Sequence, residues 1–74
     1  MAENENVPVL HVRYAGRSDD IPLGDLDIGA ASPDREVHKR LAIRLNIQVG
    51  ALRDYIVDRH ANGNMTVRPE AVFG

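Results

Sequence analysis

Alternating apolar and polar positions mark the first structured segment of the chain. From Pro8 to Tyr14 every second residue is apolar, and Val9, His11 and Arg13 lie between them. A period of two places successive side chains on opposite faces of a strand, so this segment is predicted to be a half-buried strand. The side chains predicted to face the core are Pro8, Leu10, Val12 and Tyr14.

A polar turn after this strand predicts a hairpin. Residues 15–20 read Ala-Gly-Arg-Ser-Asp-Asp, which is typical of a turn, and Ile21 and Leu23 then fall on one side of a short return strand. Because Pro22 cannot donate a backbone hydrogen bond within a sheet, the return strand is predicted to lie at a sheet edge.

One amphipathic helix is predicted over residues 33–45. Ser32-Pro33-Asp34 combines a hydroxyl N-cap, a proline at the first helical position and an early acid, as is typical of a helix start. A helical period then gathers an apolar stripe on one face, formed by Val37, His38, Leu41, Ala42 and Leu45. This stripe is predicted to pack against the sheet.

The other face of this helix carries the candidate functional residues. Basic side chains gather there in a protein whose formal net charge is −2, and one isoleucine lies among them. Such a surface fits an acidic protein partner, with charge governing mainly the association rate and the isoleucine acting as an apolar anchor. The candidate partner-binding residues are Arg35, Lys39, Arg40, Ile43 and Arg44. A solvated helix face is the alternative interpretation of the same pattern.

Two further strands are predicted in the second half of the chain. Tyr55-Ile56-Val57 is aromatic and β-branched, which favours a strand, and residues 62–64 read Asn-Gly-Asn, which favours a reversal. A three-residue loop would align Val57 with Val67 and leave Asp58 in solvent.

Isolated hydrophobic residues occur in two connecting segments. Leu26 and Ile28 interrupt an acidic loop before the helix, and Ile47, Val49 and Leu52 follow the helix. The second group is predicted to anchor its connection to the core.

The predicted order is strand, strand, helix, strand, strand, in one α+β domain over residues 7–74 that follows a disordered tail at residues 1–6. From residue 8 onward this order resembles a minimal β-grasp, the fold of ubiquitin and the small sulfur-carrier proteins. The chain lacks the insertion between the later strands of ubiquitin, and it reads Phe73-Gly74 where such modifiers end in Gly-Gly. The resemblance implies a protein-binding module, or alternatively a modifier or sulfur carrier that acts through Gly74.

Residue types that carry catalysis or metal binding form no recognisable pattern. His11, His38 and His60 fall on separate predicted elements and provide no short ligand pair. Neither Ser18 nor Ser32 lies in a nucleophile-elbow sequence, and the chain contains no cysteine. We therefore expect no enzymatic activity, no metal site and no cofactor.

A winged helix that binds DNA is the competing interpretation. Residues 41–56 also fit a helix-turn-helix, with residues 62–64 in a wing and Arg53, Arg59 and Arg68 directed at phosphate. Against it stand a β-branched pair, two acids on the supposed recognition helix and a negative net charge. Nucleic acid is therefore not the expected partner.

Length and charge distribution bear on the size of the domain and on how charge divides between the two halves of the chain. A chain of 74 residues forms one small domain, which buries only about 60% of the surface of its unfolded chain. Residues 1–34 hold seven acids and two bases, a net charge of −5, whereas residues 35–74 hold seven bases and four acids, a net charge of +3. No apolar run approaches the roughly 20 residues of a membrane span, so a cytoplasmic location without membrane contact is expected.

Overall fold

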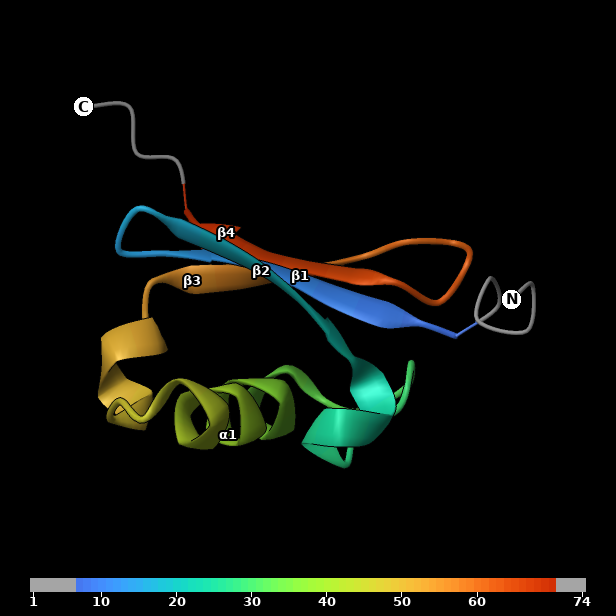
Figure 1. Ribbon diagram of the computed structural model, residues 1–74, viewed down its shortest axis with the longest axis horizontal. Helices are drawn as coiled ribbons and strands as arrows, with labels where there is room; N and C mark the ends of the chain where they lie inside the picture. Colours follow the sequence, from blue (N-terminus) through green and yellow to red (C-terminus); the bar gives the residue numbers. More distant parts are fainter. Residues whose placement is uncertain (1–6, 71–74) are drawn as a thin grey trace.

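The computed structural model describes residues 7–70 and confirms the predicted ββαββ order in an α+β fold. Its elements are β1 (Val9–Tyr14), β2 (Arg17–Pro22), the short 3-10 helix η2 (Leu23–Leu26), α1 (Asp34–Leu45), the short 3-10 helix η3 (Val49–Leu52), β3 (Tyr55–Arg59) and β4 (Met65–Pro69). The strands form one layer, and α1 lies with η2 and η3 on one side of it (Figure 1). The tail predicted at residues 1–6 lies outside the described residues, as do residues 71–74.

The four strands form one mixed sheet in the order β2-β1-β4-β3. Two antiparallel hairpins, β1–β2 and β3–β4, meet where β1 runs parallel to β4. This arrangement is compatible with a β-grasp-like topology. It also confirms that the Pro22 strand lies at an edge of the sheet, where its missing N–H costs no ladder hydrogen bond.

The first hairpin turns sooner than the sequence predicted. Ala15 and Gly16 both adopt left-handed conformations, with φ of 53° and 80°, so they form a two-residue turn whose twist suits an antiparallel pair. Consequently β2 begins at Arg17, and the polar residues assigned to a turn extend the strand instead. Alanine gives little sequence indication of a positive φ, because glycine, asparagine and aspartate usually take that role.

Gly16→Ala is expected to lower the free energy of unfolding by about 1 kcal/mol, because a side chain is strained at this positive φ. Gly24→Ala is the matched control, since a Cβ at either glycine would meet open space but Gly24 has no positive φ. The control should be neutral or slightly stabilising in urea denaturation. Equal losses from both substitutions would contradict the turn geometry.

The start of α1 corrects the predicted N-cap. Pro33 occupies the cap position in an extended conformation, and its carbonyl oxygen accepts from the N–H groups of Glu36 and Val37 at 3.0 Å. The Ser32 hydroxyl oxygen instead accepts from the Gly29 N–H at 2.9 Å, in the preceding turn. The helix therefore begins one residue later than predicted, and the serine stabilises the approach to the helix.

The end of α1 is closed by its own backbone. Asn46 is left-handed, with φ of 59°, and its N–H lies 3.2 Å from the Ile43 carbonyl oxygen. The Ile47 N–H donates to the Ala42 carbonyl oxygen at 3.0 Å, which completes a Schellman motif. Ile47 then packs against the core, as predicted for this connection.

The core lies between the sheet and the helical layer. It contains more residues than the predicted apolar stripe of α1 and the predicted inward faces of the strands. The buried residues that the sequence predicted are Leu10, Val12, Val37, Leu41, Ala42 and Val67, with Tyr14 and Leu45 packed against them, and Leu52 is buried as predicted for its connection. The other buried hydrophobic residues are Ile21, Leu23, Leu26, Ile28 and Met65. Most of these additional side chains come from η2 and its flanking segments. The prediction for Val49 was wrong, because this side chain is 53% exposed.

The second hairpin has the predicted register. Val57 pairs directly with Val67, the His60 N–H donates to the Asn64 carbonyl oxygen at 2.9 Å, and Gly63 takes a positive φ of 94°. Asp58 is only half-exposed, and its carboxylate accepts a hydrogen bond from Arg68. Residues 55–59 thus form a strand, and α1 is the single α-helix within residues 7–70, so these residues do not adopt a winged-helix fold.

Candidate partner-binding surface

The outward side of α1 presents the predicted candidate residues to solvent. Ile43 is 66% exposed, which is the largest exposure of a large hydrophobic side chain in the described part of the chain. Arg35, Lys39 and Arg44 are also exposed, whereas Arg40 is partly buried. Helical spacing divides these side chains into two groups, because residues three and four apart share a flank of the helix. Ile43 lies between the flank of Arg40 and Arg44 and that of Arg35 and Lys39.

A shallow hollow adjoins the first of these flanks. It has a volume of about 200 Å³ and is lined by Asp25, Leu26, Asp27, Arg40, Ile43 and Arg44. Leu26 is buried and supplies an apolar element, while the two aspartates come from η2 and its C-cap. The structure therefore brings three of the five candidate residues to one hollow. Arg35 and Lys39 do not line it.

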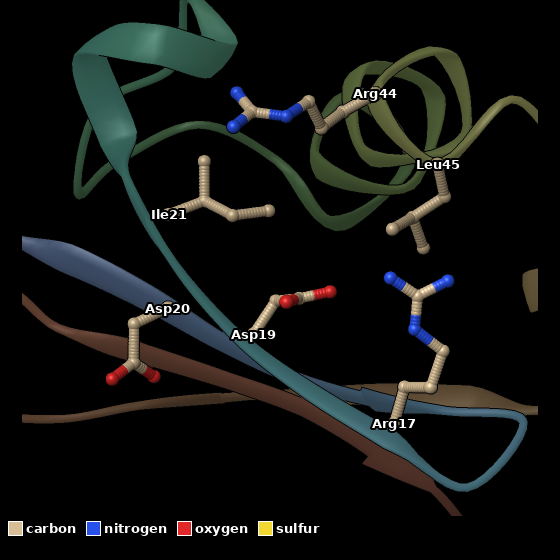
Figure 2. Close-up of a pocket in the computed structure, with 6 residues that line it drawn as sticks. All are labelled: Arg17, Asp19, Asp20, Ile21, Arg44 and Leu45. Carbon is tan, nitrogen blue, oxygen red and sulfur yellow. The ribbon is translucent and has the colours of Figure 1, made fainter.

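A second hollow lies between β2 and the last turn of α1 (Figure 2). Its volume is about 330 Å³, and its lining residues are Arg17, Asp19, Asp20, Ile21, Arg44 and Leu45. Figure 2 shows Asp19 and Arg17 extending from β2 toward the helix, whereas Asp20 points to the other side of the strand. Arg44 lines this hollow as well as the first, so it lies between the two.

Positive charge on this surface is only partly neutralised within the protein. Arg40 Nε donates to Glu36 Oε2 at 3.0 Å in a half-exposed i,i+4 pair, a geometry that typically contributes only about 0.3–0.5 kcal/mol. In the part of the chain that the structure describes, Arg35, Lys39 and Arg44 form no ion pair with another residue. Three cationic side chains therefore remain available on the outward side of α1.

Polar side chains on the sheet face opposite α1 are largely paired with one another. Arg68 Nε donates to Asp58 Oδ2 at 2.9 Å, and His60 Nε2 lies 2.9 Å from Thr66 Oγ1. His11 Nδ1 also contacts Asp20 across β1 and β2. These cross-strand contacts partly neutralise the charges of this face within the protein.

The three histidines lie on separate elements, as predicted. His11 lies on β1, His38 on α1, and His60 follows β3. His38 is partly buried at the margin of the core, and its Nε2 is buried without a hydrogen-bond partner. Residues 7–70 contain no group of three histidine, aspartate or glutamate side chains arranged to hold a metal ion. No helix in that range has the length and apolar character needed to cross a membrane.

Carboxylates lie close to the three arginines that the DNA-binding alternative would direct at phosphate. The observed pairs are Arg53–Asp54 at 3.9 Å, Arg59–Asp34 at 2.6 Å and Arg68–Asp58 at 2.9 Å. A phosphate would have to compete with each of these negative charges. The arginines also come from different elements and do not lie along one recognition helix.

Comparison of the chain with protein-family models, with curated proteins and with solved structures gave no match. The fold and the surface therefore carry the functional argument. They describe a small α+β domain with a four-stranded mixed sheet, a β-grasp-compatible strand order and one helix with a basic, partly apolar outer face.

Proposed function

We propose that this protein is a non-catalytic interaction module that binds an acidic protein partner on the outward side of α1. The observation that carries the proposal is the exposure of Ile43 beside Lys39 and Arg44, which form no ion pair within the described residues. The hollows on either side of Arg44 add concave space at this surface.

Apolar burial and charge would contribute differently to binding at this surface. Burial of a side chain the size of isoleucine contributes about 1.5–3 kcal/mol, whereas solvent-exposed ion pairs contribute little to affinity. Complementary charge accelerates encounter and selects among partners. Ile43 is therefore proposed as the anchor, and Arg44 as the residue that attracts and orients an acidic segment.

The strand order also supports a proposed relationship to the ubiquitin-like β-grasp superfamily. Within that superfamily, use of the domain surface is proposed in preference to chemistry at Gly74, because the exposed side of α1 offers a surface for docking. Gly74 lies outside the described residues, and a cytoplasmic location likewise stays a prediction.

Site-specific photo-crosslinking in the native host tests the proposed surface. A photoreactive amino acid at position 43 is expected to capture one discrete partner, and Arg44→Glu in the same chain should reduce that capture. Position 49 is the matched control, because Val49 is also an exposed apolar residue but lies on η3. The same products from positions 43 and 49, with no effect of Arg44→Glu, would refute the proposal.

Binding kinetics with the captured partner should separate the two contributions. Arg44→Glu is expected to slow association and weaken its salt dependence, whereas Ile43→Ala should chiefly accelerate dissociation. Arg53→Glu makes the same charge change at an exposed site near η3 and should have little effect. An equal loss of association rate from Arg44→Glu and Arg53→Glu would show that only net charge matters.

A further inference from the structure

The outer edge of β3 carries backbone groups with no partner strand in the described structure. β3 lies at one end of the sheet and pairs only with β4. The hydrogen bonds from His60 N–H to Asn64 and from Glu70 N–H to Asp54 fix which residues face β4. In an antiparallel pair these residues alternate, so the even-numbered positions of β3 face β4. The N–H and C=O groups of Tyr55, Val57 and Arg59 consequently point away from the sheet.

The two edges of the sheet differ in their protection against strand pairing. At the β2 edge, the outward backbone groups belong to Ser18, Asp20 and Pro22, by the same alternation from the two-residue turn. Pro22 has no N–H, and Asp19 and Asp20 place two negative charges on this strand. Proline and charge are common means of blocking an edge. β3 contains no proline and begins with three hydrophobic residues, Tyr55 to Val57, and its two charges, Asp58 and Arg59, are of opposite sign.

The sequence of β3 is complementary to itself in one antiparallel register. With Val57 opposite Val57 of a second copy, Tyr55 lies opposite Arg59, and Ile56 lies opposite Asp58. Asp54 then lies opposite His60, which adds an acid–imidazole pair. The aliphatic part of the Arg59 side chain can pack on the Tyr55 ring of the second copy while its guanidinium stays on Asp34. Ile56 opposite Asp58 contributes no stabilising pair of its own.

Registers shifted by one or two residues from the Val57-centred pairing are less favourable for the two β3 strands. A shift of one residue would turn the outward N–H and C=O groups away from each other. A shift of two places Asp58 opposite Asp58 in one direction, and Asp54 opposite Asp58 in the other. Like charges directly opposite each other destabilise the pair, so the Val57-centred register is selected.

We propose that the β3 edge is a self-association surface, on which a second copy of this chain adds its own β3 in the Val57-centred antiparallel register. The product is a twofold-symmetric dimer with a continuous sheet twice as wide and both α1 helices on the same face. The proposal is independent of the α1 surface, because β3 contributes no residue to either hollow beside Arg44.

Disulfide trapping tests the register, because the natural chain has no cysteine. Ile56→Cys and Asp58→Cys proteins are mixed and oxidised; opposite residues of a non-hydrogen-bonded pair have Cα atoms about 4.5 Å apart, which a disulfide can span. The mixture is expected to form a mixed dimer as the main product, whereas each protein alone should not. Asp54→Cys with His60→Cys is a second pair at exposed positions, in case Asp58→Cys weakens the fold.

The β2 edge supplies the matched control. Arg17→Cys and Asp19→Cys have the same spacing and occupy the corresponding non-hydrogen-bonded positions for pairing at the outer edge of β2, and they should not cross-link. Sedimentation equilibrium of the wild-type chain is expected to show a mass that rises from 8.2 kDa toward twice that value with concentration. A constant monomer mass, equal trapping at the β2 edge, or preferential cross-linking of the Ile56→Cys protein to itself would each overturn the proposal.

Discussion

Leu41→Ala is expected to lower the free energy of unfolding by about 2–5 kcal/mol, the range for truncating a large buried aliphatic side chain. Leu41 has 0% exposure and lies in the middle of α1, where the helix packs on the sheet. The total stability of a domain this small is of order 5 kcal/mol, so the variant should be largely unfolded or close to it. Thermal and urea denaturation followed by circular dichroism measure the change.

Ile43→Ala is the internal control for this experiment. It shortens a side chain two residues away on the same helix, with a similar small change in helix propensity, but Ile43 is mostly solvent-exposed. Its free energy of unfolding should change by less than about 0.5 kcal/mol. If Leu41→Ala unfolded at the same temperature as the wild type, α1 would not be part of the core.

Leu52→Ala should also lower the free energy of unfolding by about 2–5 kcal/mol. Leu52 is fully buried although it belongs to η3, a single 3-10 turn between α1 and β3. Loss of its side chain would leave a cavity beneath the sheet. The change can be measured by the same denaturation series.

Val49→Ala is the matched control, because Val49 belongs to the same turn and is 53% exposed. It should have little effect on stability. A small change in both variants would contradict the finding that η3 closes one side of the core, and a large change in both would contradict the exposure of Val49.

Regular periodicity explains which parts of the fold could be predicted from the sequence. The period of two around Leu10 and Val12 and the helical stripe around Leu41 each depend on several residues, so they survive local irregularities. The reversal at residues 62–64 set the correct register of the second hairpin, with Val57 opposite Val67. These elements together defined the α+β class and the ββαββ order.

The short 3-10 helices explain why several buried residues were not identified from the sequence. η2 and η3 contain four residues each, too few to show a period, so the sequence placed Leu26 only in an acidic loop and did not distinguish the buried Leu52 from the exposed Val49 as an anchor of the second connection. The prediction that Ser32 caps α1 was wrong for another reason. A serine hydroxyl can accept a hydrogen bond either from a helix N-terminus or from the turn before it. Which of the two it binds depends on the path of the backbone, which no local motif encodes.

The candidate surface could be predicted only as one helix face. Charge and helical spacing identified Arg40, Ile43 and Arg44, and the structure adds the acidic segment around η2 and the β2 wall. Those segments are distant in the chain, so only tertiary structure brings them beside Arg44. Binding by these residues is still a prediction.

Chemical-shift mapping by NMR tests the proposed α1 surface most directly. The captured partner is titrated into isotope-labelled protein, and the shifts are expected to concentrate at residues 35–44, with those of Ile43 and Arg44 among the largest. Shifts confined to the opposite sheet face around His11, Arg13 and Thr66, with residues 35–44 unchanged, would contradict it.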